Sequence, residues 1–380
     1  MLRGCSSFQG RFLTVVVLII LACAVFSWVV DAQVAPTTYP LYTGTDPKPV
    51  PPAPALGPAN SVITDPTFGT RILRVTDQNT DSGNSLISTE TGFKRTFNAD
   101  STAIKLSGVG GKGFWLEFNA AAFKVGDGTS RPSPHPLWFG SNWEWSAVDP
   151  DIIYFLNGNK IAKYNKSTGV TTNLGGPPNG DAVTYATAVI GQDNWVCSAA
   201  GAGYQDSYTK FFCINPSNTS QYQFVDVYNK TINGAPATNL TKWPTSAAGQ
   251  VIGIHAIAPG TGSKWVYLSF HQQSWGGNGD AIFNLQSQTW SLVTNADPYW
   301  SGHATLGNGK FTNGSGTKSG TDPRSYLVRD PDDLMNASKY LFIEQPTDTA
   351  EWCTGEHPSW HNSGNNPDAP LLISRFAPTS

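Results

Sequence analysis

Hydrophobic and polar residues alternate with a period of two along several short stretches of the chain, between turns rich in Gly, Asn, Asp and Pro. The clearest stretch is EWSAVDPDIIYFLNGNKIAKYNKSTG, residues 144–169, where the alternation is interrupted at 149–151 and again at 157–159. Such alternation predicts β-strands with one buried face, and Asn-Gly between two runs predicts a tight hairpin. The stretch therefore predicts four consecutive strands separated by turns.

A repeated turn is the most informative feature of the sequence. In four segments an apolar run ends in Asn, followed by a short turn and another predicted strand. They are WLEFNAAAFKV, IAKYNKSTGVTTNL, FFCINPSNTSQYQFVDV and AIFNLQSQTWSLV, which contain Asn119, Asn165, Asn215 and Asn284. Successive Asn residues lie 46, 50 and 69 positions apart, the last interval including extra residues around 229–249. Four short strands repeated at this spacing are typical of β-propeller blades.

We therefore predict an all-β fold, a β-propeller of six or seven four-stranded blades closed by N- and C-terminal strands. The closing sheet would contain TRILRVTD, residues 70–77, and PLLISRF, residues 370–376. Pairing of these two segments would remove the free edges. A β-sandwich or a β-helix is the alternative. A sandwich does not repeat its turn chemistry at a fixed spacing, and a β-helix has a shorter repeat.

The N-terminal segment has the features of an export signal. Arg3 and Arg11 precede the apolar run 12–30, and Val30-Asp31-Ala32 matches a small-residue cleavage site. Residues 1–32 are predicted to be a signal peptide. An uncleaved anchor, with membrane contact, is the alternative, because the run is long enough to span a bilayer. Residues 33–60 contain eight Pro and predict an extended linker, with the propeller domain at 61–380. We expect a secreted, cell-surface or periplasmic protein.

The charge content limits the class of partner, and the cysteine content bears on disulfide formation. Charged residues make up 13% of the chain, the formal net charge is −3, and no basic run occurs, which argues against a nucleic-acid partner. We expect a monomer that binds a polysaccharide or oligosaccharide. Three Cys follow the signal segment. Cys197 and Cys213 can form a disulfide if they lie on neighbouring strands, or can be buried thiols, and Cys353 has no obvious partner.

Polar and aromatic residues gather at the predicted starts of the first strands of the blades, which line one mouth of a propeller channel. They are Lys94, Arg95, Trp143, Glu144, Trp145, His255, His303, Glu356 and His357. His255, His303 and His357 are 48 and 54 positions apart, at equivalent points of three blades. One His at a strand start often bonds a turn carbonyl, whereas three that converge favour a metal or an anionic ligand.

Other residues extend this predicted mouth. His271 begins a polar loop that can line the same cleft. Four Trp offer ring faces of the kind that stack on sugars, with packing between blades as the alternative, namely Trp143, Trp145, Trp275 and Trp360. Pro358 lacks an N–H and must lie at the start or edge of a strand, which places His357 just outside the sheet. A turn at 359–360 would then let His361 share one ion with His357 and His303.

The architecture, with His residues from successive first strands and a late His pair, resembles the oligogalacturonide-lyase type of secreted or periplasmic polysaccharide lyase. The resemblance implies a divalent metal, usually manganese, held by three His and a Gln. By position the His candidates are His303, His357 and His361. The Gln of the family is missing and Glu356 stands nearby, and the His pair is spaced by four residues rather than two. Mn, Ca and Zn are therefore not distinguished.

The resemblance implies β-elimination on a uronate-containing polysaccharide. A metal or Arg neutralises the C6 carboxylate, a base removes the C5 proton, and the 4-linked sugar leaves. Arg95 suits the carboxylate, and Lys94 or His255 suits proton removal. Two alternatives remain open. One is a non-catalytic glycan-binding propeller with a Trp-lined mouth, and the other is a hydrolase whose Glu144 and Glu356 face each other across the channel.

Overall fold

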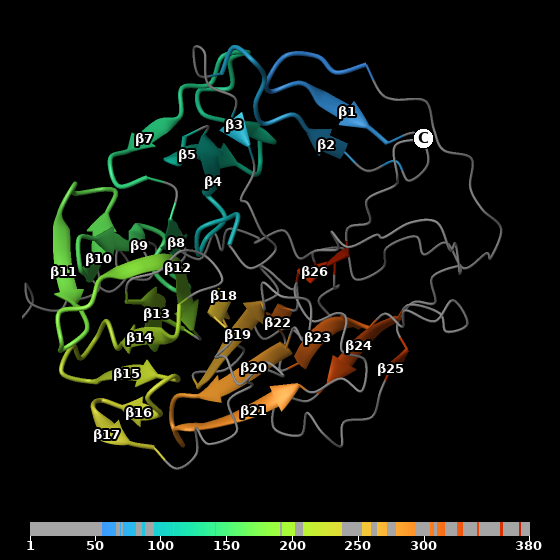
Figure 1. Ribbon diagram of the computed structural model, residues 1–380. Helices are drawn as coiled ribbons and strands as arrows, with labels where there is room; N and C mark the ends of the chain where they lie inside the picture. Colours follow the sequence, from blue (N-terminus) through green and yellow to red (C-terminus); the bar gives the residue numbers. More distant parts are fainter. Residues whose placement is uncertain are drawn as a thin grey trace, which may run out of the picture. The chain divides into compact units, whose positions relative to one another are not determined.

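The computed structural model describes a large part of the chain after the predicted linker. The described residues are 55–65, 69, 71–80, 86–87, 95–108, 110–140, 142–190, 192–201, 208–237, 253–259, 264–271, 279–293, 305–307, 310–315, 325–329, 340–341, 358–359 and 372–373. Every named element among them is a β-strand (Figure 1). In this part of the chain no helix reaches the length and apolar character that crossing a membrane requires.

The chain divides into two compact units. One comprises Met1–Pro54 and Thr64–Arg71, and the other comprises Ala55–Ile63 and Ile72–Ser380. In the first unit the Gly69 N–H donates to the Asp65 carbonyl oxygen at 2.8 Å. All the large sheets lie in the second unit.

Among the described residues, five antiparallel sheets of four or more strands follow one another in chain order. The first contains β3 (Leu86–Ile87), β4 (Ala103–Gly108), β5 (Lys112–Asn119) and β6 (Lys124–Val125), with β7 (His135–Leu137) also paired to β5. The second contains β8 (Trp143–Trp145), β9 (Ile152–Asn157), β10 (Lys160–Asn165) and β11 (Thr171–Gly175). The third contains β12 (Val183–Ile190), β13 (Trp195–Ala200), β14 (Lys210–Ile214), β15 (Tyr222–Asp226), β16 (Thr231–Ile232) and β17 (Ala235–Pro236). The fourth contains β18 (Gly253–Pro259), β19 (Trp265–His271), β20 (Gly279–Asn284) and β21 (Thr289–Val293). The fifth contains β22 (Thr305–Gly307), β23 (Lys310–Ser315), β24 (Ser325–Arg329) and β25 (Tyr340–Leu341).

The core lies between successive sheets. One apolar cluster joins Trp115 of the first sheet to Phe155 of the second, and another joins Ile161 of the second to Phe212 of the third. A third cluster contains residues of both the third and the fourth sheets. The first strands are also neighbours, since β8 contacts β12, β12 contacts β18, and β18 contacts β22. Stacked sheets with adjacent first strands are the arrangement of propeller blades, and the predicted fold class is confirmed.

The turns with the repeated Asn are confirmed in all four sheets. Each Asn lies at the end of the third strand or directly after it, and its Oδ1 accepts backbone N–H groups two or three positions ahead. The acceptors are Asn119 (from Ala122, 2.9 Å), Asn165 (from Ser167, 3.0 Å, and Thr168, 2.9 Å), Asn215 (from Ser217, 2.9 Å) and Asn284 (from Gln286, 2.9 Å). This side-chain bond holds the chain in the turn that starts the fourth strand.

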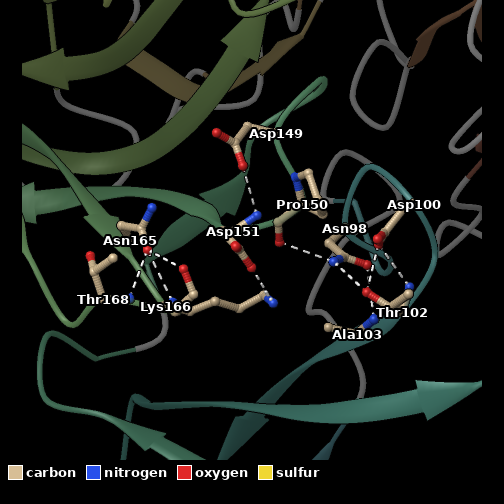
Figure 2. A network of polar contacts seen from close by, with 11 residues as sticks. Asn98, Asp100, Thr102, Ala103, Asp149, Pro150, Asp151, Asn165, Lys166 and Thr168 are labelled. Atoms are coloured by element: carbon tan, nitrogen blue, oxygen red, sulfur yellow. Dashed lines mark hydrogen bonds and ion pairs between the residues drawn. The ribbon is translucent and has the colours of Figure 1, made fainter. Parts of the chain in front are cut away.

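A second set of polar contacts ties neighbouring sheets together (Figure 2). Asn98, at the turn before β4, donates from Nδ2 to the Pro150 carbonyl oxygen at the turn before β9, at 3.0 Å. Asp193, between β12 and β13, accepts from the Ala147 N–H at 2.6 Å and the Tyr154 hydroxyl at 2.9 Å. Burial and the Asp193 carboxylate raise the pKa of Tyr154. These bonds fix the turns of one sheet against the next.

Of the two alternatives left open for Cys197 and Cys213, a disulfide or buried thiols, the structure has the disulfide. The two residues lie directly opposite each other on β13 and β14, both are fully buried, and their sulfurs are bonded at 2.04 Å. The compartment in which disulfides persist is usually extracytoplasmic.

Three expectations change in detail. The third sheet has six strands rather than four, because the extra residues after Asn229 form the β16–β17 hairpin. Folded structure begins before Ser61, since Ala59 is buried and Asn60 Oδ1 accepts from the Val125 N–H at 2.7 Å. The expected terminal sheet is not observed among the described strands: β1 (Val62–Thr64) pairs with β2 (Arg71–Leu73), and β26 (Pro358–Ser359) pairs with β27 (Leu372–Ile373). The number of blades stays a prediction.

Candidate functional site

The first strands of the third and fourth sheets share an irregularity in their pairing with the second strand. In the fourth sheet Ile254 pairs with Phe270 and Ala256 pairs with Ser269, so His255 is an extra residue in β18. In the third sheet the residues between Tyr185 and Ala188 oppose one residue of β13. Bulges of this kind bend a strand and redirect its side chains, and they are frequent next to active sites.

The first and second sheets are interrupted at a corresponding level. In the first sheet Ile87 pairs with Ser107, and the next described bridge joins Phe97 to Ile104, so the pairing of β4 is not continuous between these two bridges. Arg95 lies two residues before the second bridge. In the second sheet the ladder of β8 begins only at Trp143, opposite Phe155. The sequence-predicted residues Arg95 and His255 therefore lie where the pairing of a first strand is interrupted, and Trp143 is the first paired residue of β8.

Glu144 joins the first sheet to the second at this level. Its side chain is 1% exposed, and Oε1 accepts the N–H of Arg95 at 2.9 Å and the N–H of Trp145 at 3.1 Å. The second carboxylate oxygen, Oε2, is buried without a hydrogen-bond partner, as is Nη1 of Arg95. Two charged groups with unsatisfied buried atoms therefore lie on neighbouring segments. Unsatisfied atoms of this kind are destabilising, by about 1–3 kcal/mol each, and are few in native structures.

Another polar contact continues from the second sheet to the third. Asn142, directly before β8, accepts the N–H of Thr187 through Oδ1 at 3.2 Å. Thr187 lies in the irregular part of β12 and is fully buried. The interrupted segments of three successive first strands are thus joined by direct side-chain to backbone bonds, through Glu144 and Asn142. This chain of bonds fixes the backbone around the candidate site.

Trp143 and Trp145 lie in the core. Both are fully buried, their rings meet edge to face at a centroid separation of 4.8 Å, and both belong to the apolar cluster between the first and second sheets. Lys105 lies over the ring of Trp143, with Nζ 4.5 Å from its centroid. Such burial is what the packing interpretation predicts, and it leaves neither ring open as a platform for a sugar.

His255 and His271 lie at the same end of the fourth sheet. Gly253 pairs with His271 at the end of β19, two residues before the bulge at His255. His255 therefore lies near the start of β18, and His271 lies at the end of β19, opposite that start. Neither imidazole is a described side chain, so the structure fixes only their positions on the backbone.

Seven of the predicted site residues lie outside the described residues, namely Lys94, Trp275, His303, Glu356, His357, Trp360 and His361. Pro358 is described and is the first residue of β26, as predicted. Within the described ranges no group of three or more His, Cys, Asp or Glu is placed to hold a metal ion. The fit of a metal to the predicted ligands stays untested.

Sequence reasoning missed Trp138. This residue lies between β7 and β8, and 66% of its surface is exposed, the largest value among the exposed large hydrophobic residues. Its ring meets Phe139 at 5.2 Å and Phe155 at 5.3 Å, both edge to face. The sequence signal that could have found it is Trp-Phe-Gly directly before a predicted strand. This segment is rich in Pro and Gly and lacks the alternation that would tell which side chains are exposed.

No family model matches the sequence, and no curated protein matches it. Among solved structures the chain is similar to an oligogalacturonate lyase in complex with manganese, at 12% identity and a TM-score of 0.49, over 80% of this chain and 75% of the other. It is also similar to TolB from Acinetobacter baumannii (12%, 0.37, 71% and 55%) and to a prolyl endopeptidase (8%, 0.48, 83% and 46%). Likenesses at this level do not bear on function.

Proposed function

We propose that the protein is an exported, monomeric carbohydrate-active propeller that cleaves a uronate-containing polysaccharide by β-elimination. The observation that supports this most is the placement of Arg95. Its backbone is bound by Glu144 at the break in the first sheet, and its Nη1 has no partner among protein groups. Arg95 as a whole is half-buried, and its guanidinium is the group that we propose for a sugar carboxylate, since guanidinium binds carboxylates in a planar, two-bonded geometry.

The chemistry requires a positive charge and a base that both reach one sugar residue. In the proposed reaction the Arg95 guanidinium binds the C6 carboxylate, which stabilises the negative charge that develops when the C5 proton is removed. His255, on the bulge of β18, accepts that proton, and the bond from C4 to the leaving oxygen breaks as the C4–C5 double bond forms. A divalent ion on His303, His357 and His361 would add positive charge at the same carboxylate, and no step above depends on it.

The hydrolase alternative receives less support from the geometry. A glycosidase needs two carboxyl groups that reach the scissile bond from an open cleft. Glu144 is fully buried, and one of its oxygens already accepts two backbone N–H groups. We therefore assign Glu144 to positioning Arg95 rather than to acid catalysis.

The test is a product screen with the purified secreted protein. Polygalacturonate, alginate and other uronate polysaccharides are incubated with it, and unsaturated uronate ends are followed by their ultraviolet absorbance, alongside metal analysis of the same sample. We expect product from at least one uronate polymer, and a His255→Ala variant that forms it at least about a hundredfold more slowly. His135→Ala, an exposed His on β7, is the matched control and should retain activity. Absence of unsaturated product from every uronate polymer, or undiminished activity of His255→Ala, contradicts the proposal.

A further inference from the structure

Trp138 stands out because it is a large apolar ring that the fold exposes and yet holds in one place. It follows β7, which is paired to β5 through His135, Pro136 and Leu137. Its ring contacts Phe155, a fully buried residue of the second sheet, and Phe139 stacks on the same Phe155 ring at 3.8 Å. One edge of the indole is thus anchored while most of its surface faces solvent.

The backbone after Trp138 is fixed as firmly as the backbone before it. Gly140 has a φ of 82°, which an L side chain rarely adopts, and its carbonyl oxygen lies 2.0 Å from where a Cβ on Gly113 would be. This close approach of the loop to β5 requires glycine at both positions. A rigid exposed aromatic ring loses little conformational entropy when a ligand covers it, so this arrangement favours binding.

Polar groups lie beyond Phe155 on the same face of the second sheet. Residues two apart on a strand share a face, so Asn157 projects on the side of Phe155, about 7 Å farther along β9. Lys160 pairs with Asn157, and Asn173 pairs with Ala162, which itself pairs with Phe155. Residues directly opposite each other also share a face, so all three polar side chains lie on the face that Trp138 covers.

These polar side chains are available to a ligand. Nδ2 of Asn157 donates to Oδ1 of Asn173 at 2.9 Å, and this contact is exposed. The Asn157 carboxamide oxygen and the Asn173 amino group keep their hydrogen-bonding capacity for other partners. Lys160 is exposed and forms none of the ion pairs found in the described part of the chain. The surface therefore combines an aromatic ring, an amide pair and one cation.

We propose that Trp138, Asn157, Lys160 and Asn173 form a subsite for an acidic pyranose of a polysaccharide. The sugar ring stacks on the Trp138 indole, the amide pair bonds its hydroxyl groups, and Lys160 binds its carboxylate. The subsite deepens the proposed function, on which its choice of an acidic sugar rests. Along the chain, Trp138 lies four residues before Asn142.

The test measures binding by calorimetry, with a galacturonate trimer and a neutral glucose trimer as probes. Trp138→Ala should bind the galacturonate trimer roughly tenfold more weakly, and Trp138→Phe should fall between it and the native protein. Lys160→Ala should bind galacturonate about threefold more weakly and leave the weak binding of the neutral trimer unchanged. Melting temperature and circular dichroism confirm that each variant is folded.

Matched controls come from the same chain. Tyr228 is an exposed aromatic residue of the third sheet, and Lys163 lies on the opposite face of β10 from Lys160. Tyr228→Ala and Lys163→Ala should bind as the native protein does. Unchanged affinity of Trp138→Ala, or no binding of the galacturonate trimer by the native protein, overturns the subsite. Product formation is followed separately, so Trp138-dependent binding without unsaturated product would refute only the lyase proposal.

Discussion

The turns after the third strands and the interruptions of the first strands are the two most regular features of this fold, and they differ in one respect. The turns repeat their chemistry, with an Asn side chain accepting backbone N–H groups in four sheets. The interruptions repeat only their place, because a gap between two bridges, a short strand, a two-residue irregularity and a one-residue bulge occur there in turn. Repeated chemistry specifies the sheet, and varied chemistry at a fixed place is what a binding site requires.

The largest expected effect is on stability, and it tests whether the residues of a first strand serve the core as well as the interrupted segments. Trp143 lies on β8 but is fully buried in the core between two sheets. Trp143→Ala should lower the free energy of unfolding by about 3–5 kcal/mol, because it removes a buried aromatic side chain and leaves a cavity. Chemical denaturation measures this. Trp138→Ala, an exposed Trp, is the control and should change stability by less than about 1 kcal/mol. Equal effects would mean that burial does not separate the two residues.

The next largest effect is the loss of stability on removing the disulfide. This bond joins two middle strands of a sheet, away from both the Asn turns and the interrupted first strands. Cys197 and Cys213 are 16 positions apart, and closing a loop of this size stabilises a protein by about 3 kcal/mol. The double variant Cys197→Ala/Cys213→Ala should lose about that much in a denaturant titration. The native protein measured in reducing agent should approach the same midpoint. If reduction changes nothing, the strand pairing alone holds β13 against β14.

The smallest expected effect is on melting temperature and concerns the turns that follow the repeated Asn residues. Gln288 follows Asn284 by four positions and has a φ of 56°, and Gly169 has a φ of 72° at the equivalent place after Asn165. A non-glycine residue in this conformation is strained by about 1–2 kcal/mol. Gln288→Gly should therefore raise the melting temperature slightly, whereas Gly169→Ala should lower it. A lower melting temperature for Gln288→Gly, or a higher one for Gly169→Ala, would show that the two turns are not equivalent.

The sequence predicted what depends on local patterns. Alternation and Asn-Gly turns located most strands, and the turn at Asn165 formed as expected because its bonds reach only two or three residues ahead. The burial of Trp143 could not be predicted, because alternation does not say which face of β8 meets another sheet. Trp138 was missed for a related reason. Its exposure depends on Gly140 approaching Gly113, a contact between residues far apart in the sequence.

The contact between Glu144 and Arg95 lies between these cases. Both residues were expected at first-strand starts, and the structure brings them together, but a buried carboxylate that binds the backbone of its neighbour leaves no mark in the sequence. Such a bond depends on how two sheets stack. The same holds for Asp193, whose partners Ala147 and Tyr154 belong to another sheet.

We propose that Arg95 binds the substrate and that Asn165 stabilises the fold, and one paired measurement tests this division of roles. Product formation and unfolding free energy are measured for Arg95→Gln and Asn165→Ala, with the exposed Arg131→Gln as control. Arg95→Gln should form product at least about a hundredfold more slowly at nearly native stability. Asn165→Ala should lose about 1 kcal/mol of stability and retain native activity per folded molecule. An Arg95→Gln variant that is destabilised yet turns over uronate at the native rate would contradict the account.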